Sequence, residues 1–570
     1  AAPRQYTETP HPLTVELDSD EPLNVIRTLR QSDAFVFTGW GDEVGLLDAH
    51  TWQQLDTIID TVQEIFQTGE GAIIMSGAGT SGRLAVQMAC RGNAALKQLG
   101  KPPLFRYLLA AGDAAVVKSA EATEDDPEAA ARDLEGIMPS TGRVVLIGIT
   151  CGLSATYVGA QLQKSVLEPR CLSVLMGFNP VEAARAVEIP VWGKSFAGFM
   201  RECGSKIICL TPVVGPESVT GSTRMKGGTT TKILLEIICD RALGRLSGGE
   251  KPTSSLVYAC HSAMQRAYAP AADIAGLARR GADTLLKGGR IVYLSDTHVG
   301  PLAVLDASEC PPTFGADFND IRAFIDHGWA CLDNREGDQS HRGANYRLAL
   351  SDFVSDVVPC LGSADLVVVV SCLSAAHPTP PTDLTTALSA VLATEASTAA
   401  ITVLSPTYDA KPPHLDVATT LTVSLRDVQP FSFLPTIEEL AAKLVLNAFS
   451  TAVHVLRGTV FRNRMVNVSV SNHKLFHRAV GILVAVTGRE HADAQTALLR
   501  SIYEVDEVAP ELASAPVAQH VEKAKAVQRV VPVAILLLLS ASPVSVATAR
   551  EQVNRHRQVR LLIQDLQHTK

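Results

Sequence analysis

The sequence lacks the cysteine patterns that indicate a disulfide framework or a zinc site. Its eleven cysteines are scattered singly, with no CxxC pair and no Cys/His spacing typical of metal ligands. We therefore expect no metal and no cofactor. A reducing compartment, cytoplasmic or nuclear, is the simplest location. The N-terminus has no apolar signal-peptide segment, but an organelle stays open because the chain begins with Ala1 and not with Met.

The chain also lacks a membrane-spanning run and an excess of basic charge. Its most apolar stretch, residues 530–539, is far shorter than the roughly 20 residues a spanning helix needs. A net charge of −9 argues against nucleic acid or an anionic membrane as the main partner. The 570 residues, 46% hydrophobic and 19% charged, predict about three or four globular domains.

Two stretches of the chain, residues 71–86 and 289–304, are similar without a gap. Each has the pattern of a buried strand, a turn and a helix start. Two more pairs follow in the same order about 220 residues apart, 144–154 with 366–374 and 174–180 with 401–406. Unbroken apolar strands separated by helical stretches indicate parallel sheets covered on both faces. The sequence thus predicts two similar doubly wound α/β domains, with ligands beyond the carboxyl ends of the strands.

The rest of the pattern divides the chain into three predicted domains. A helix over residues 229–246 is followed by the turn at 248–252, which marks a boundary. After residue 447 strand signals fade, and from about residue 460 helices alternate with polar breaks. We predict residues 1–253 as an N-terminal segment with the first α/β domain, 254–459 as the second, and 460–570 as an all-helical cap.

The two copies differ in a complementary way at their first turn. In the first copy the turn over residues 77–82 includes Gly79, Thr80 and Ser81, which suits a phosphate held by backbone N–H groups at a helix start, although a plain tight turn has the same composition. The second copy has Asp296 in its turn, and Glu309 where the first has Arg91. If the halves face each other, they form one composite site with Glu309 pointing toward Ser81.

Small hydroxyl side chains and two further polar residues add to this site. Thr150 and Ser154 follow a neighbouring strand, and Asn179 could contact a sugar. The segment 220–231 is rich in Ser and Thr and includes Ser222, Thr223 and Lys226. Helix caps would explain one or two of these hydroxyls. The number of hydroxyls together with Arg224 and Lys226 favours an anion or sugar site.

Two carboxylates are candidates for acid and base chemistry. Glu309 precedes Pro311-Pro312, which should end or stiffen its helix, and Glu124 lies in an acidic stretch that could equally be a solvated helix start. Lys474 lies between His473 and His477. No acidic or cysteine ligand accompanies this histidine pair, so we interpret it as a surface feature and not as a metal site.

Four long motifs, at residues 77–85, 215–228, 306–315 and 471–475, resemble signatures of the N-acetylmuramic acid 6-phosphate etherase family and of its eukaryotic relatives, the glucokinase regulatory proteins. The resemblance implies two flavodoxin-like sugar isomerase (SIS) domains and a helical cap in one chain. It also implies phosphate or sugar contacts, with Lys474 reaching in from the cap. The implied contact residues are Gly79, Thr80, Ser81, Thr150, Ser154, Ser222 and Lys474.

The resemblance leaves three functions open. The first is a binding protein that senses a hexose phosphate, such as fructose 6-phosphate or fructose 1-phosphate, and regulates a sugar kinase. The second is a lyase that cleaves the lactyl ether of N-acetylmuramic acid 6-phosphate with Glu124 and Glu309 as acid and base. The third is a structural subunit with a vestigial pocket. Residues 425–435 are shorter than the loop with which the regulatory proteins grip glucokinase, so the partner stays open.

Overall fold

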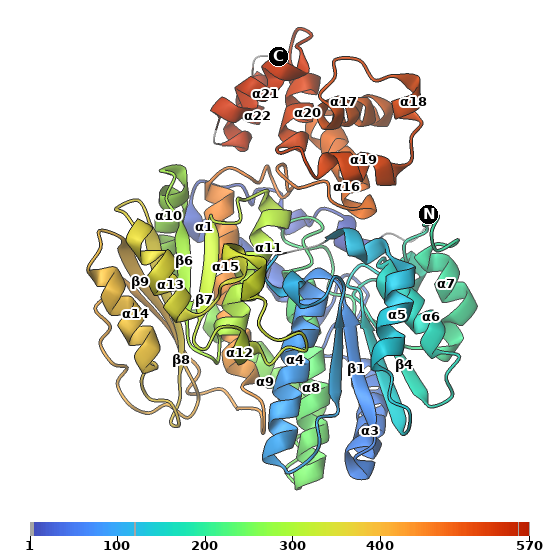
Figure 1. Cartoon of the computed structure of the whole chain (residues 1–570), viewed down its shortest axis with the longest axis vertical. Helices are drawn as coiled ribbons and strands as arrows, with labels where there is room; N and C mark the ends of the chain where they lie inside the picture. The colour runs from blue at the N-terminus through green and yellow to red at the C-terminus, as the bar shows by residue number, and fades with distance from the viewer. Residues whose placement is uncertain (1–4, 119–120, 557, 569–570) are drawn as a thin grey trace.

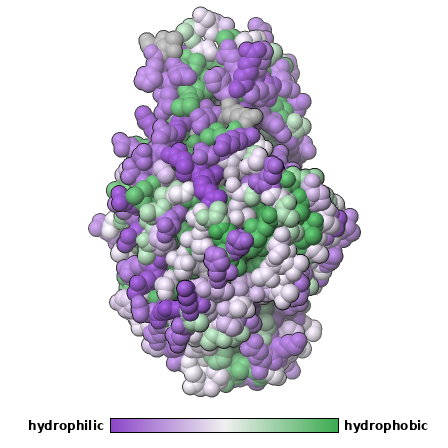
Figure 2. Space-filling view, turned by 90° about the vertical axis from the view of Figure 1, so that its left-hand side faces the viewer, coloured by the Kyte–Doolittle hydropathy of each residue, from purple (hydrophilic) through white to green (hydrophobic). Residues whose placement is uncertain are grey.

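The structure is a computed structural model that describes residues 5–118, 121–556 and 558–568. Two β-sheets lie side by side in the larger part of the molecule, and a helical domain formed by the C-terminal residues stands at one end of it (Figure 1). Seen from the side of the second sheet, apolar areas are interspersed with hydrophilic ones, and the helical domain presents a mostly hydrophilic surface (Figure 2).

The first sheet has five parallel strands in the order β2-β1-β3-β4-β5. Alternate residues of each strand enter opposite cores: Ile73 and Met75 pack with α3 and α4, while Ala72 and Ile74 pack with α5, α6 and α7. The elements are β1 (Gly71–Gly77), β2 (Phe105–Leu109), β3 (Arg143–Ile149), β4 (Cys171–Met176), β5 (Ile208–Leu210), α3 (Ala49–Thr68), α4 (Gly79–Gln98), α5 (Pro127–Ile137), α6 (Thr156–Ser165) and α7 (Phe196–Cys203).

The second sheet repeats this order as β7-β6-β8-β9-β10, again with parallel strands. Helices α10, α11 and α15 cover one face, and α13 and α14 cover the other. The elements are β6 (Ile291–Ser295), β7 (Ile321–Ile325), β8 (Leu366–Leu373), β9 (Ser397–Leu404), β10 (Thr420–Ser424), α10 (Ala271–Leu286), α11 (Gly300–Phe314), α12 (Trp329–Leu332), α13 (Leu350–Asp356), α14 (Thr382–Leu392) and α15 (Thr436–Leu456).

Two long buried helices join the halves. Helix α8 (Lys226–Ser247) contacts α3 and α4 of the first half and α15 of the second. Among the described residues, α15 is the one helix with the length and composition to cross a membrane, but its apolar stretch is entirely buried in protein. The N-terminal α1 (Pro22–Asp33) packs on α10 and α15, followed by α2 (Phe35–Thr38), and α9 (Thr253–Ala267) packs on α15. One continuous core therefore spans both halves.

The C-terminal domain is built around α20 (Val530–Leu539), whose side chains are almost all buried. It contacts α16 (His473–Thr487), α17 (His491–Tyr503), α21 (Val546–Arg555) and α22 (Val559–His568). The remaining helices are α18 (Pro510–Ala513) and α19 (Val517–Ala524). We call residues 460–570 the lid. The short apolar run at 530–539 is thus the core helix of the lid.

The predicted fold class, two doubly wound α/β domains with a helical C-terminal region, is confirmed by the two sheets and their order. The helix predicted over 229–246 is α8, which ends at Gly248 in the left-handed conformation that favours glycine. Helix α11 runs through Pro311 and Pro312 and ends at Phe314, two residues after the proline pair, with Gly315 as the left-handed C-cap. The domain boundaries at 253 and 459 stay a prediction.

Candidate functional site

A cavity lies where the first sheet, the second half and the lid meet, beyond the carboxyl ends of β1 and β3. Residues from all three parts line it: the α4 start, the turn after β3 and the segment before α8 from the first half, Glu309 and Pro312 from α11, and Lys474 and Arg478 from α16. Ten of the twelve residues predicted for the site line this cavity: Gly79, Thr80, Ser81, Glu124, Thr150, Ser154, Ser222, Thr223, Glu309 and Lys474.

The loop between β1 and α4 provides backbone donors. Helix α4 begins at Gly79, whose φ of +52° is in the left-handed region that glycine tolerates. The N-cap residue Ala78 has no side-chain oxygen, so no side chain of its own caps the first turn. A Cβ at Gly82 would lie 2.5 Å from the Gly77 carbonyl oxygen, which explains a glycine at each end of this tight turn.

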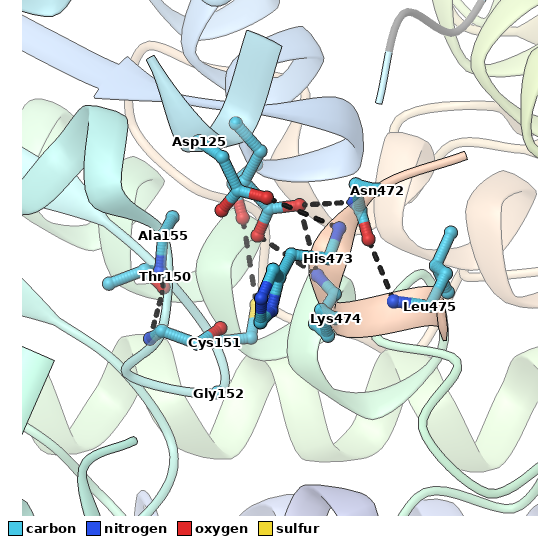
Figure 3. Close-up of polar contacts among 12 residues, drawn as sticks. Asp125, Thr150, Cys151, Gly152, Ala155, Asn472, His473, Lys474 and Leu475 are labelled. Atoms are coloured by element: carbon cyan, nitrogen blue, oxygen red, sulfur yellow. Dashed lines mark hydrogen bonds and ion pairs between the residues drawn. The ribbon is translucent and has the colours of Figure 1, made fainter. Parts of the chain in front are cut away.

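Thr150 and Ser154 form the second wall. The Thr150 hydroxyl oxygen accepts hydrogen bonds from the backbone N–H groups of Ser154 and Ala155, both at 3.1 Å, at the start of α6 (Figure 3). Since its oxygen is used as an acceptor, the hydroxyl hydrogen is left to donate. Thr150 is 5% exposed and Ser154 is 8% exposed. Both hydroxyls therefore suit a small polar ligand bound deep in the cavity.

The segment before α8 contributes a buried hydroxyl. Ser222 is 4% exposed, and its Oγ has no hydrogen-bond partner among the described residues. A buried hydroxyl left unpaired is costly, so this atom marks a position where a ligand or water would be stabilised. Thr223 lines the cavity beside it, and its backbone carbonyl accepts a hydrogen bond from Gly228.

Lys474 reaches the cavity from the first turn of α16. Its Nζ lies 2.9 and 3.0 Å from the two carboxylate oxygens of Glu124, and Asn472 Nδ2 donates to the same carboxylate at 3.2 Å. Figure 3 shows this lid segment facing the short helix η4 (Glu121–Asp125). Glu124 is 9% exposed and so is not a solvated helix start; Asp126 caps α5 instead. The Lys474–Glu124 pair ties the lid to the first half.

Glu309 is held by an arginine that the sequence analysis did not single out. Arg83, 3% exposed, donates from Nη1 to the Glu309 carboxylate and from Nε to the backbone oxygens of Ala115 and Val116 at 2.8 and 3.2 Å. Arg83 lies within the motif at residues 77–85, one residue after the glycine turn. The structure thus brings Glu309 of the second half into the cavity that Ser81 lines, as the composite-site expectation requires.

Two predicted ligand contacts are not among the described residues that line the cavity. Asn179 is fully buried and exchanges hydrogen bonds with Thr7, fixing the N-terminal segment. Lys226 is also fully buried. Its Nζ donates to the Val214 carbonyl at 2.9 Å, and its amine lies over the rings of Phe35 and Trp40. We therefore leave Asn179 and Lys226 out of the proposed ligand contacts.

Charges of both signs converge on the cavity. Burial raises the pKa of Asp125 above its usual range, and the neighbouring Glu124 adds to the increase. Burial lowers the pKa of His473 to about 4, and the adjacent Arg185 adds to the decrease.

His473 contacts Arg185 through Nδ1, which disfavours a metal at this histidine. The described residues contain no group of three or more His, Cys, Asp or Glu side chains placed to hold a metal.

The N-terminal segment closes one side of the cavity. Glu8 lines it and forms an ion pair with Arg478 of α16, with N···O distances of 2.6 and 3.0 Å. Neither residue was predicted. Glu8 comes from a short polar segment and Arg478 from an ordinary amphipathic helix, so only the fold brings them together.

The corresponding loop of the second half is filled by its own side chain. The Asp296 carboxylate accepts hydrogen bonds from the backbone N–H groups of His298, Val299 and Cys372 at 2.9, 3.1 and 2.7 Å. These N–H groups correspond to those of Thr80, Ser81 and Cys151 in the repeat. Asp296 therefore does more than repel an anion: it occupies the donors that an anion would use.

Three family models match: the glucokinase regulatory protein N-terminal SIS domain at residues 57–166, the second SIS domain of that protein at 268–457, and its C-terminal lid domain at 462–563. The chain is 29% identical over 249 residues to the N-acetylmuramic acid 6-phosphate etherase of Rhodopirellula baltica, a match that covers 42% of this chain and 69% of the etherase.

Two of the solved structures that are similar to this chain have low sequence identity to it. The C-terminal domain of glucosamine-fructose-6-phosphate aminotransferase from Francisella tularensis is 10% identical, with a TM-score of 0.43, covering 76% of this chain and 96% of that one. The tagatose-6-phosphate ketose/aldose isomerase from Escherichia coli is 12% identical, with a TM-score of 0.43, covering 79% and 95%.

Full-length relatives are more similar in sequence. The glucokinase regulatory protein of Xenopus laevis is 32% identical over 590 aligned positions, covering 98% of this chain and 92% of the relative. That of Homo sapiens is 32% identical, covering 95% and 89%. With two SIS domains, a lid and similarity along almost its whole length, the chain belongs to the glucokinase regulatory protein family.

Proposed function

We propose that this protein binds a hexose phosphate in the cavity and uses the bound ligand to control its association with a sugar kinase. The observation that carries the proposal is that several anion-binding groups converge in one cavity. They are the start of α4, which has no side-chain cap, the buried hydroxyls of Thr150, Ser154 and Ser222, and Lys474. Backbone N–H groups, hydroxyls and an ammonium are the groups that bind a phosphate without a metal.

The phosphate would lie at the start of α4, where the N–H groups of Thr80 and Ser81 and the helix dipole favour negative charge. The hydroxyls of Ser222 and Thr150 would donate to its oxygens or to the sugar. Lys474 would exchange part of its contact with Glu124 for the phosphate. Glu309, held by Arg83, would accept hydrogen bonds from sugar hydroxyls.

Such a ligand would connect three parts of the molecule. It would contact α4 in the first half, α11 in the second and α16 in the lid, so its binding energy depends on how these parts are placed. A ligand can shift a conformational equilibrium by as much as it favours one arrangement over another. The kinase partner is carried over from the family, whose members named here are glucokinase regulatory proteins.

Ligand binding is tested by thermal unfolding with fructose 6-phosphate, fructose 1-phosphate and unphosphorylated fructose. A specific ligand at 100 times its Kd should stabilise the protein by about 2.7 kcal/mol, whereas fructose should have little effect. If neither phosphate raises Tm at millimolar concentration, the proposal is wrong. Co-elution with glucokinase, with and without the stabilising phosphate, then tests the partner: equal complex formation in both conditions would contradict ligand control.

The second candidate is a lyase, because Glu124 and Glu309 line the same cavity from opposite halves. Two carboxylates could transfer protons during elimination of a lactyl ether. Incubation with N-acetylmuramic acid 6-phosphate should then release lactate, and Glu309→Gln should abolish the release. Absence of lactate with the wild-type protein would exclude this function. A structural subunit with a vestigial pocket predicts neither sugar-phosphate binding nor lactate.

A further inference from the structure

A second cavity lies between the two halves, next to the candidate site. Helix α4 lines it with Arg83, Val86, Cys90 and Ala94, and helix α11 of the second half lines it with Pro301 and Leu305. Arg83 lines this cavity, whereas its ion-pair partner Glu309 lines the candidate site. The Arg83–Glu309 pair therefore separates the two cavities, which we call the interdomain cavity and the sugar cavity.

The helical spacing explains why the interdomain cavity leads to this ion pair. Pro301, Leu305 and Glu309 follow one another at four-residue intervals on one face of α11. On α4 the lining residues lie three or four positions apart on one helix face: Arg83, Val86, Cys90 and Ala94. The two helix faces meet, and the apolar walls end at the guanidinium and the carboxylate.

The lining is apolar apart from a few polar groups, and most of these already have partners. Gln87 and Arg91 both donate to Glu439, and Arg91 also donates to the backbone oxygen of His298 at 2.8 Å. The Cys90 thiol donates to the Asp333 carbonyl at 3.4 Å. Among the buried polar groups of the lining, Arg83 is the exception: its Nη2 has no hydrogen-bond partner among the described residues.

We propose that the interdomain cavity binds a small carboxylate with an apolar body, whose carboxylate pairs with Arg83. A guanidinium with one unsatisfied nitrogen at the end of an apolar cavity suits a single anionic group, because a charge-assisted hydrogen bond from Nη2 to a carboxylate oxygen would satisfy that nitrogen. The interdomain cavity, about 110 Å³, is similar in size to the sugar cavity, about 90 Å³.

The position of Arg83 couples the two cavities. A carboxylate bound to Arg83 competes with Glu309 for the guanidinium and leaves the negative charge of Glu309 less well compensated in the sugar cavity. That charge repels a phosphate, so the acid weakens hexose phosphate binding. Linkage requires the hexose phosphate to weaken acid binding by the same factor. This coupling rests on the proposed function, whereas acid binding does not.

Titration of the full-length protein with butyrate, hexanoate and benzoate, monitored by ligand-detected NMR, tests the proposal, with benzamide as the neutral control for benzoate. We expect benzoate to bind at least roughly tenfold more tightly than benzamide. Ala94, exposed at the mouth of the cavity, allows a blocking variant, Ala94→Trp, with Ala272→Trp on exposed α10 surface as its matched control. Ala94→Trp should abolish acid binding and Ala272→Trp should not.

In the second part of the experiment the Kd of fructose 6-phosphate is measured with and without saturating benzoate. A rise of roughly fivefold or more that disappears in Ala94→Trp supports the coupling. Equal affinity for benzoate and benzamide, acid binding that survives Ala94→Trp, or no acid binding at millimolar concentration would each overturn the proposal. Acid binding without any hexose phosphate binding would instead refute the proposed function and leave the carboxylate site standing.

Discussion

At the scale of single residues, the candidate site depends on a few buried or partly buried charges whose partners come from distant parts of the chain. Lys474 of the lid contacts Glu124 of the first half, and Arg83 of the first half contacts Glu309 of the second. Removing one member of such a pair leaves the other uncompensated. Substitutions here therefore report on binding only when stability is measured alongside.

Lys474→Met should weaken binding of the stabilising hexose phosphate by about 10- to 100-fold, because a hydrogen bond to a charged group contributes about 1.5–3 kcal/mol. Calorimetric titration measures the Kd, and Tm of the free protein shows whether the lid stays folded. Lys523→Met, at an exposed position of α19, is the matched control. An unchanged Kd in Lys474→Met would remove this residue from the site.

His11 should make the protein sensitive to acid. It is fully buried, its Nδ1 accepts the Leu13 N–H at 3.1 Å, and burial together with the nearby Lys226 lowers its pKa to about 3. The unfolded chain binds this proton near pH 6.5. The contribution of neutral His11 to the free energy of unfolding is therefore complete above pH 6.5 and is lost as pH falls toward 3. At pH 5 the free energy of unfolding should be lower by about 1–2 kcal/mol.

His11→Asn keeps an acceptor for the Leu13 N–H but cannot take up the proton. The free energy of unfolding of this variant should therefore fall less between pH 7 and pH 5 than that of the wild type. Denaturant unfolding at both pH values measures the difference, and His50→Asn at an exposed site of α3 is the control. Parallel curves for the wild type and His11→Asn would contradict the assignment.

At the scale of elements, the two copies of the strand-turn-helix unit have the same order of elements. They differ in which groups accept hydrogen bonds from the backbone N–H groups of the turn. The first turn of α4 has Ala78 at its N-cap, while the equivalent donors at α11 are satisfied by Asp296. The sequence predicted that only the first loop suits an anion. The reason found in the structure is stronger than repulsion, since a carboxylate of the chain already fills the second loop.

Asp296→Ala should destabilise the second half by about 2–4 kcal/mol, because three N–H groups, two of them fully buried, lose their acceptor. Denaturant unfolding followed by circular dichroism measures the change, and Asp383→Ala on the exposed start of α14 should change stability by less than about 0.5 kcal/mol. A loss as small as that of the control would show that water replaces the carboxylate.

At the scale of the whole molecule, the halves are joined by a buried ionic network. Glu439 of α15 accepts hydrogen bonds from Lys232 of α8 and from Arg91 and Gln87 of α4. Lys232 also pairs with Glu236. Together with the continuous apolar core, this network predicts that the two halves unfold in one transition.

Glu439→Ala should lower the free energy of unfolding by about 3–5 kcal/mol, since Lys232 and Arg91 lose a buried partner. Calorimetry should show one heat-absorption peak that moves to lower temperature. Glu395→Ala, at an exposed position before β9, is the control. Two separated peaks in the wild-type protein would contradict the single cooperative unit.

Much of the fold and most of the site could be predicted from the sequence, for identifiable reasons. Buried parallel strands such as β1 and β3 are unbroken apolar runs, and the turn at Gly79–Ser81 needs small residues that stand out in the sequence. Arg83, Glu8 and Arg478 could not be predicted, because their residue types are ordinary at helix and loop positions. Asn179 and Lys226 were placed at the site for their chemistry, yet Asn179 bonds to Thr7 and the amine of Lys226 lies over the rings of Phe35 and Trp40.

The sequence by itself determined the repeated strand-turn-helix units, the helical lid and the family, because local apolar patterns and long motifs depend only on neighbouring residues. Only the tertiary structure decided which polar groups meet. Glu309 and Arg83 lie 226 positions apart, and Lys474 and Glu124 lie 350 apart. Such pairs form because α8 and α15 bury one shared core and thereby fix the halves and the lid around a single cavity.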